Sequence, residues 1–205
     1  MKLRILALAV VAMFQMVATA GQDEKTLIGT TIDLRKLSDV MGEHEISFCV
    51  RPSPNTIKNL PGHAFVSFSV LPRNKQRTFL SIGHTVQPNT SLASAIWSYF
   101  GAPISGYLSE ENYTSVRQAC LVAKVDRADY HKALSLTKNP LESIGISSPS
   151  APVLQMYNLG SEDCVEFMIN VANVLKPNGL KVPSRGTFEL PMQFMQRFIS
   201  SNQNN

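Results

Sequence analysis

The sequence predicts an α+β domain in which a small antiparallel β-sheet packs against helices. Residues 63–71 alternate between an apolar face and a face that begins with His63, which is the period of a strand. Residues 161–175 place apolar side chains three and four positions apart, which is the period of a helix. The two periods, in separate parts of one chain, predict that strands and helices share one core.

The predicted strands are runs rich in β-branched and apolar residues, at 26–34, 45–50, 63–71, 77–86 and 116–125. Residues 51–61 hold three prolines and two asparagines and predict a loop. A turn before residues 77–86 predicts a hairpin with residues 63–71. His63, near the start of one strand, and His84, near the end of the next, then lie at neighbouring ends of an antiparallel pair.

Helices are predicted mainly in the second half of the chain. Asp126 is a suitable N-cap for a helix over 127–138, and a Lys-Pro-Asn-Gly sequence ends the helix of 161–175. The remaining segments are a short helix or covering loop at 90–100, a surface segment at 101–112, a loop at 144–152 and a short helix within 187–200.

The first twenty residues have the pattern of a secretory signal peptide. Lys2 and Arg4 form a basic start, residues 5–17 are apolar except for Gln15, and Ala18-Thr19-Ala20 is a small-residue cleavage site. The apolar stretch is shorter than the roughly twenty residues that span a bilayer. We therefore expect residues 1–20 to be removed and residues 21–205 to form a single exported domain, periplasmic or secreted.

The charge of the chain does not indicate a nucleic-acid partner. The formal net charge is +4, and removing Lys2 and Arg4 with the signal peptide leaves 4 − 2 = +2. No run of Lys and Arg is longer than two residues, so we expect no nucleic-acid partner. No phosphate-binding loop, metal-ligand cluster or G-x-S-x-G sequence is present, so we expect no cofactor and no metal.

Three cysteines leave an odd thiol in an oxidising compartment. Cys49 and Cys120 lie in predicted strands. Either both are buried thiols, or they pair across the sheet and leave Cys164 free. The sequence does not decide between the two, because a disulfide depends on distance.

Cys164 lies in the first turn of its predicted helix. With Ser161 as N-cap it would be the third helical residue, close to main-chain N–H groups that stabilise a thiolate or a developing oxyanion. The positive end of a helix and a nearby imidazole both lower a thiol's pKa, whereas the adjacent Glu162 and Asp163 raise it. A Cys and a His brought together by the fold are sufficient for nucleophilic acyl chemistry, and His63 is the candidate partner.

The order of these features resembles the circularly permuted papain-like proteins of the NlpC-like superfamily, which includes exported bacterial members and the lecithin retinol acyltransferase group. The resemblance rests on residues 62–66, on the strand and helix of 119–136, and on 157–183, with Y-x-L-x-x-x-x-C-x-x-F and G-L-x-V-P. It implies a permuted papain-like fold, with Cys164 as nucleophile, His63 as general base and His84 orienting His63. Many relatives have Asn before the Cys, where this chain has Asp163.

The resemblance and the export signal together imply an exported cysteine amidase or peptidase that acts on a cell-envelope amide bond, such as one in peptidoglycan. Asp163 motivates one alternative, a non-catalytic protein that binds the envelope or a protein partner. A second alternative is a thiol acyltransferase acting on lipid, in which Trp97, Tyr99 and Phe100 line an apolar entrance instead of belonging to the core. No stable membrane insertion is expected.

Overall fold

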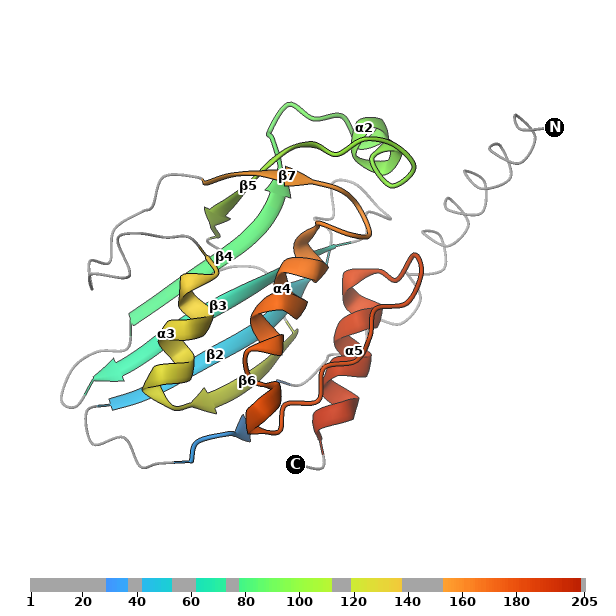
Figure 1. Cartoon of the computed structure of the whole chain (residues 1–205). Coiled ribbons are helices and arrows are strands. Elements are labelled where there is room, and N and C mark those ends of the chain that lie inside the picture. Colours follow the sequence, from blue (N-terminus) through green and yellow to red (C-terminus); the bar gives the residue numbers. More distant parts are fainter. Residues whose placement is uncertain are drawn as a thin grey trace.

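The structure is a computed structural model, and it describes residues 29–36, 42–52, 62–72, 78–111, 119–137 and 153–203. These residues form one seven-stranded sheet, accompanied within the same ranges by four α-helices (Figure 1). The predicted signal peptide of residues 1–20, the loop of 144–152 and most of the loop of 51–61 lie outside the described residues. An α+β architecture is confirmed.

The sheet is mixed and larger than the small antiparallel sheet that the sequence predicts. Its strands lie in the order β1-β6-β2-β3-β4-β5-β7, and β1 pairs with β6 in parallel while all other neighbours are antiparallel. The strands are β1 (Thr30–Asp33), β2 (Gly42–Arg51), β3 (His63–Pro72), β4 (Thr78–Val86), β5 (Ile104–Glu110), β6 (Ala119–Val125) and β7 (Val153–Tyr157).

Three helices cover one face of this sheet: α3 (Arg127–Ser135), α4 (Cys164–Asn173) and α5 (Pro191–Asn202) (Figure 1). The core between sheet and helices is apolar because alternate strand residues point toward the helices. Phe48 on β2 packs on Phe198 of α5, and Phe68 on β3 packs on Tyr130 of α3, with ring centroids 5.4 and 5.8 Å apart. The fourth helix, α2 (Leu92–Trp97), lies at the opposite end of the sheet from α3.

Two strands at the β7 end of the sheet differ from the prediction. The surface segment predicted at 101–112, with Gly106 among its turn residues, contains the strand β5, and β7 was not predicted. Gly106 suggested a turn, but it is a point of close approach between three strands. A Cβ at that position would lie 2.7 Å from the Thr85 carbonyl oxygen and 2.7 Å from Tyr157 Cβ. Glycine is therefore required by packing at this position of β5.

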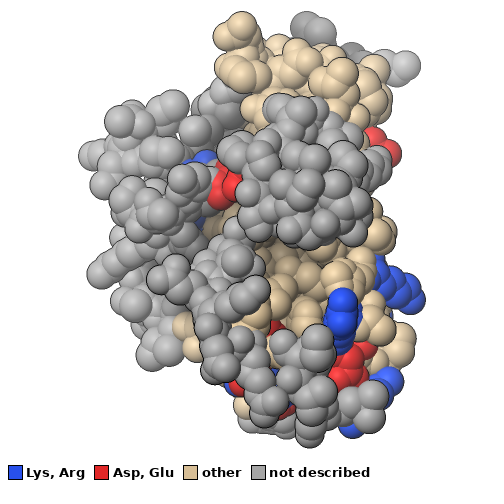
Figure 2. Space-filling model, turned by 90° about the vertical axis from the view of Figure 1, so that its left-hand side faces the viewer, with Lys and Arg blue, Asp and Glu red and all other residues tan. Residues whose placement is uncertain are grey.

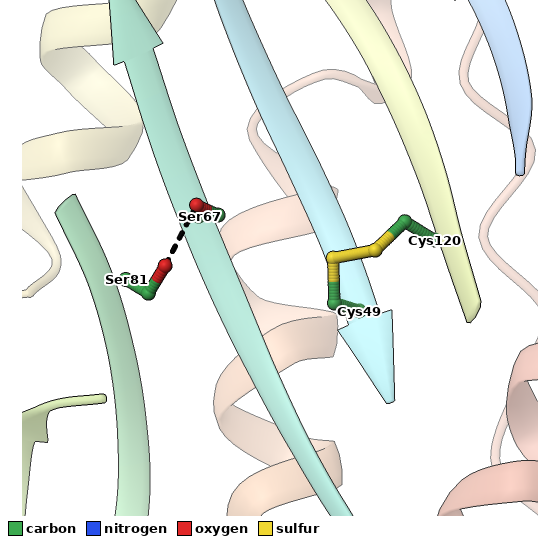
Figure 3. The surroundings of a disulfide bond; sticks show 4 residues. All are labelled: Cys49, Ser67, Ser81 and Cys120. Atoms are coloured by element: carbon green, nitrogen blue, oxygen red, sulfur yellow. Dashed lines mark hydrogen bonds between the residues drawn. A yellow bond between two sulfur atoms is a disulfide. The ribbon is translucent and has the colours of Figure 1, made fainter. Parts of the chain in front are cut away.

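Cys49 and Cys120 form a disulfide between neighbouring strands (Figure 3). They are directly opposite each other in the register of β2 and β6, with Cα atoms 4.2 Å apart. On the adjacent strands the hydroxyls of Ser67 and Ser81 make a hydrogen bond of 2.8 Å. The disulfide leaves Cys164 as the free cysteine.

No helix among the described residues combines the length and the apolar character needed to cross a bilayer.

Candidate active site

Cys164 is the first residue of α4, so it lies at the positive end of the helix dipole. The N-cap is Asp163 and not Ser161, which corrects the predicted start of the helix by two residues. A turn closed by the pairing of Asn158 with Glu162 precedes it and directs the chain from β7 into α4. Cys164 is buried, with 6% of its surface exposed.

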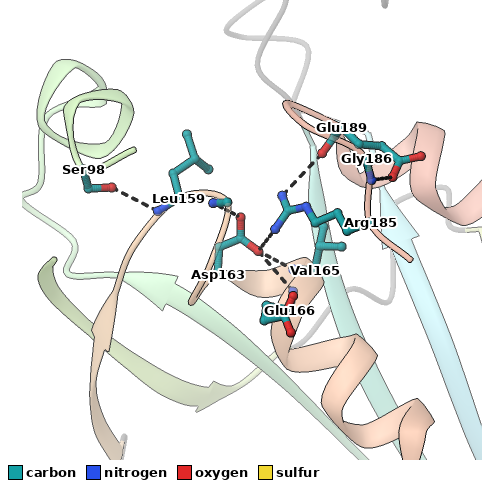
Figure 4. Close-up of polar contacts among 9 residues, drawn as sticks. Ser98, Leu159, Asp163, Val165, Glu166, Arg185, Gly186 and Glu189 are labelled. Atoms are coloured by element: carbon teal, nitrogen blue, oxygen red, sulfur yellow. Dashed lines mark hydrogen bonds and ion pairs between the residues drawn. The ribbon is translucent and has the colours of Figure 1, made fainter. Parts of the chain in front are cut away.

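The Asp163 carboxylate is a buried N-cap that is fully engaged (Figure 4). Its Oδ1 accepts hydrogen bonds from the main-chain N–H groups of Val165 and Glu166, at 3.0 and 3.1 Å. Its Oδ2 accepts one from Gly160 N, at 2.8 Å. Arg185 Nη1 forms an ion pair with Oδ1 at 2.7 Å. The acidic neighbour of the thiol therefore carries a charge that four donors stabilise.

His63 and Cys164 come together at one end of the sheet. His63 is the first residue of β3, before the first pair of β3 with β4, and it is buried, with 9% of its surface exposed. Burial alone would lower the pKa of His63, but hydrogen bonds to Cys164 and Glu111, together with the charges of both, raise it to about 9. At neutral pH the imidazole is therefore protonated beside the thiol.

Glu111 is the group that supports His63, and no local sequence pattern predicts this role. Its Oε1 lies 3.0 Å from His63 Nε2, and its main-chain N–H donates to Ser81 O at 2.7 Å. The pair meets above Gly83, where a Cβ would lie 2.4 Å from Glu111 Oε1 and 2.6 Å from His63 Nε2. The missing side chain of Gly83 is thus what allows Glu111 to reach across β4 to His63.

The structure places His84 away from the position predicted for it. His84 follows Gly83 on β4, so its side chain points to the opposite face of the strand from the meeting point of His63 and Glu111. Its ring packs edge-on against Tyr157, with centroids 5.3 Å apart. Burial lowers the pKa of His84, against the opposing effect of the Gln155 main chain. The contact expected of an orienting residue is made by Glu111.

Tyr157, at the end of β7, lies within electrostatic reach of Cys164. Burial raises its pKa well above the ordinary value, and the charges of Cys164 and Asp163 raise it further, while Arg185 opposes them. The hydroxyl is therefore a neutral hydrogen-bond donor at physiological pH. Tyr157 is the first residue of the Y-x-L-x-x-x-x-C-x-x-F motif, but the sequence predicts no role for it.

The first turn of α4 offers fewer free donors for an oxyanion than the sequence suggested. The N–H groups of Val165 and Glu166 are bonded to the Asp163 side chain, and that of Phe167 to the Asp163 carbonyl oxygen. The main-chain N–H of Cys164 donates to none of the described residues. It is therefore the donor of this turn that remains available to a substrate oxygen.

Aromatic side chains flank the loop that leads into α4. The aromatic patch consists of Trp97, Tyr99, Phe100 and Phe188. The Tyr99 ring lies against Gly160 and stacks on Phe188 with centroids 4.5 Å apart, and Ser98 Oγ accepts a hydrogen bond from Leu159 N (Figure 4). Trp97 and Phe100 are 51% and 42% exposed, so they are surface residues and do not belong to the core.

Three of the four residues of this patch, Trp97, Tyr99 and Phe100, lie in an uncharged stretch of the chain. Residues 78–109 contain no Lys, Arg, Asp or Glu. Figure 2 accordingly shows the upper end of the molecule, where α2 and β5 lie, in tan, with the visible charged side chains below it.

Within the described ranges, no group of three or more His, Cys, Asp and Glu side chains is arranged to hold a metal ion. No family model, curated protein or solved structure matches this chain. The resemblance to permuted papain-like proteins therefore rests on the sequence motifs alone, and the function has to be argued from the geometry of the site.

Proposed function

We propose that this protein is an exported cysteine hydrolase that cleaves an amide bond of the cell envelope, with Cys164 as nucleophile and His63 as acid and base. The observation that carries the proposal is the hydrogen bond between the two residues, in a buried site where Glu111 supports the protonated imidazole. Export rests on the signal-peptide pattern of residues 1–20, and the permuted papain-like fold rests on the motif resemblance.

In the acylation step, the Cys164 thiolate attacks the carbonyl carbon, and the carbonyl electrons move to oxygen. The Cys164 N–H is placed to donate to this oxyanion. As the intermediate collapses, the C–N bond breaks and the leaving nitrogen takes the proton of the His63 imidazolium. The products are a free amine and a thioester on Cys164.

Deacylation reverses these roles. Neutral His63 takes a proton from water, and the hydroxide attacks the thioester carbonyl. The C–S bond breaks, the acid product leaves, and the thiolate–imidazolium pair is restored. Glu111 holds the ring through both steps, since it is bonded to His63 Nε2 at 3.0 Å.

Purified peptidoglycan sacculi are the first substrate to test, because peptidoglycan contains amide bonds of the kind that the proposed enzyme would cleave. The wild-type protein should release stem-peptide fragments, and Cys164→Ala should release none. Equal release by both proteins would refute the assigned nucleophile. Normal binding and phenotype in a folded Cys164→Ser variant would instead favour the non-catalytic binding protein.

The exposed aromatic patch favours one second candidate, a thiol acyltransferase acting on lipid. Trp97 and Phe100 expose ring surface beside the loop that leads to Cys164, as an apolar acyl chain would require. Incubation with a labelled phospholipid followed by intact-mass analysis separates the two candidates. An acyl adduct on Cys164, without release of stem peptides, would favour the acyltransferase.

A further inference from the structure

The residue before the nucleophile is an acid in a place where an unbalanced negative charge would oppose thiolate formation. Asp163 is buried, with 1% of its surface exposed, so water does not screen its charge. The three main-chain donors stabilise the carboxylate but carry no net charge. Arg185 is the cation that contacts it, at 2.7 Å.

Arg185 reaches this position from a separate segment that is itself fastened to α5. Its Nη2 donates to Glu189 O at 3.3 Å, and Gly186 N donates to Glu189 Oε2 at 2.8 Å (Figure 4). The Glu189 carboxylate also pairs with Arg197 of α5, at 2.6 and 2.7 Å, and Arg197 donates to Ser184 O at 2.7 Å. The contacts on both sides of Arg185 thus hold the guanidinium in place.

The charge of Arg185 acts on the whole cluster around the thiol. Burial alone would lower the pKa of Arg185, but the hydrogen bond to Asp163 and the charges of Asp163, Cys164 and Glu166 raise it. Arg185 in turn lowers the pKa values of Glu166 and Tyr157, against the effect of burial. The titratable and charged groups that interact with Cys164 or with the residues around the start of α4 are His63, Glu111, His84, Tyr157, Glu162, Asp163, Cys164, Glu166 and Arg185.

Among these groups, removing Arg185 would leave the imidazolium of His63 as the cation that faces the thiolate and four acidic side chains, those of Glu111, Glu162, Asp163 and Glu166. A like charge within about 4–6 Å disfavours ionisation and shifts a titration by about 1–3 units. Removing the cation from a buried ion pair also strongly destabilises the folded protein, because the carboxylate is left buried without an opposite charge. While Arg185 is paired with Asp163, its positive charge offsets the negative charge of that carboxylate.

We propose that Arg185 is a positioning residue of this site, whose guanidinium neutralises Asp163 and so allows an acidic N-cap to stand beside a thiolate. The proposal rests on the proposed function in one respect, that Cys164 is the nucleophile. It explains how a chain with Asp163 at this position retains a site suited to catalysis. The Asp163–Arg185 ion pair then caps α4 as a neutral N-cap would, because it adds no net charge beside the thiol.

The test is the pH dependence of iodoacetamide alkylation of Cys164 in the purified protein. Arg185→Gln should raise the alkylation midpoint by about one to two pH units, which slows alkylation roughly ten- to a hundredfold at a pH below both midpoints. Arg185→Lys, which keeps the charge, and the double variant Asp163→Asn/Arg185→Gln, which removes both charges, should stay within about half a unit of wild type. Arg35→Gln is the matched control, because Arg35 pairs with Asp33 near β1, at the other edge of the sheet.

An unchanged midpoint in Arg185→Gln, or an equal rise in the double variant, would overturn the proposal. If Arg185→Gln does not fold, the double variant decides: it must fold and titrate like wild type, and failure of either overturns the proposal. A wild-type midpoint near the pH 8.5 of a free thiol would count against the proposed function itself. A low wild-type midpoint that Arg185→Gln leaves unchanged would refute the role of Arg185 alone.

Discussion

Replacing Glu111 with Gln isolates the charge that supports His63. The substitution keeps the shape of the side chain and one hydrogen-bonding oxygen, but removes the negative charge that lies 3.0 Å from His63 Nε2. Both side chains are largely buried, so solvent screens the interaction little. An opposite charge at this distance shifts a pKa by about 1–3 units, which corresponds to roughly 1–4 kcal/mol.

The pKa of His63 should therefore fall from about 9 to between roughly 6 and 8 in Glu111→Gln. The pKa of His63 falls because burial disfavours the protonated imidazole, whereas the charge of Glu111, which the substitution removes, favours it. The assay is an NMR titration of the imidazole Cε1–H resonances, with the His63 signal assigned by its loss in His63→Gln. Hydrolysis should decline at the same time, because fewer molecules then hold the thiolate–imidazolium pair.

Two controls make the result specific. Glu110→Gln removes the same charge one residue earlier, from an exposed side chain, and should leave the His63 titration unchanged. His84→Gln should leave it unchanged as well, because His84 points to the other face of β4. An unaltered His63 titration in Glu111→Gln, or a large shift in His84→Gln, would refute the assignment of Glu111 as the supporting residue.

Three further predictions concern stability and packing. The pKa of His63 is raised from 6.5 to about 9, so its contribution to stability is complete below pH 6.5 and lost as pH rises through 9. Urea unfolding over this pH range should show that the free energy of unfolding falls by up to about 3 kcal/mol in wild type but not in His63→Gln. An equal fall in His63→Gln would contradict this assignment. Gly83→Ala should abolish hydrolysis in a folded protein, since the added Cβ would meet both Glu111 and His63; full activity would show that the pair is not needed. Replacing both Cys49 and Cys120 with Ala should lower the free energy of unfolding by about 2–4 kcal/mol without altering the alkylation of Cys164. Wild-type protein that is unfolded without a reductant should contain one free thiol. Three free thiols would disprove the disulfide.

Much of the fold could be predicted because its strands and helices keep their own periods. The strand beginning at His63, its hairpin partner and the helix that carries Cys164 all follow from local patterns. β5 could not be predicted, because Gly106 marks a turn in local sequence but a close contact with Thr85 and Tyr157 in the fold. Such a contact depends on strands that are distant in sequence.

The partners of the candidate site depend on register and not on local pattern. Glu111 lies 48 residues from His63, and Arg185 lies 22 residues from Asp163. Nothing near either residue in the sequence indicates the contact. The predicted hairpin places His84 near His63, yet His84 lies one position beyond Gly83 on β4, so its side chain points to the other face.

The most direct test of the account is the alkylation of Cys164 by iodoacetamide as a function of pH, in wild type and in His63→Ala. The account predicts a wild-type midpoint within roughly pH 3.5–7.5, as for activated thiols, and a return toward 8.5 when the imidazole is removed. A wild-type thiol that titrates near 8.5, unchanged by His63→Ala and equally accessible in the folded protein, would contradict it.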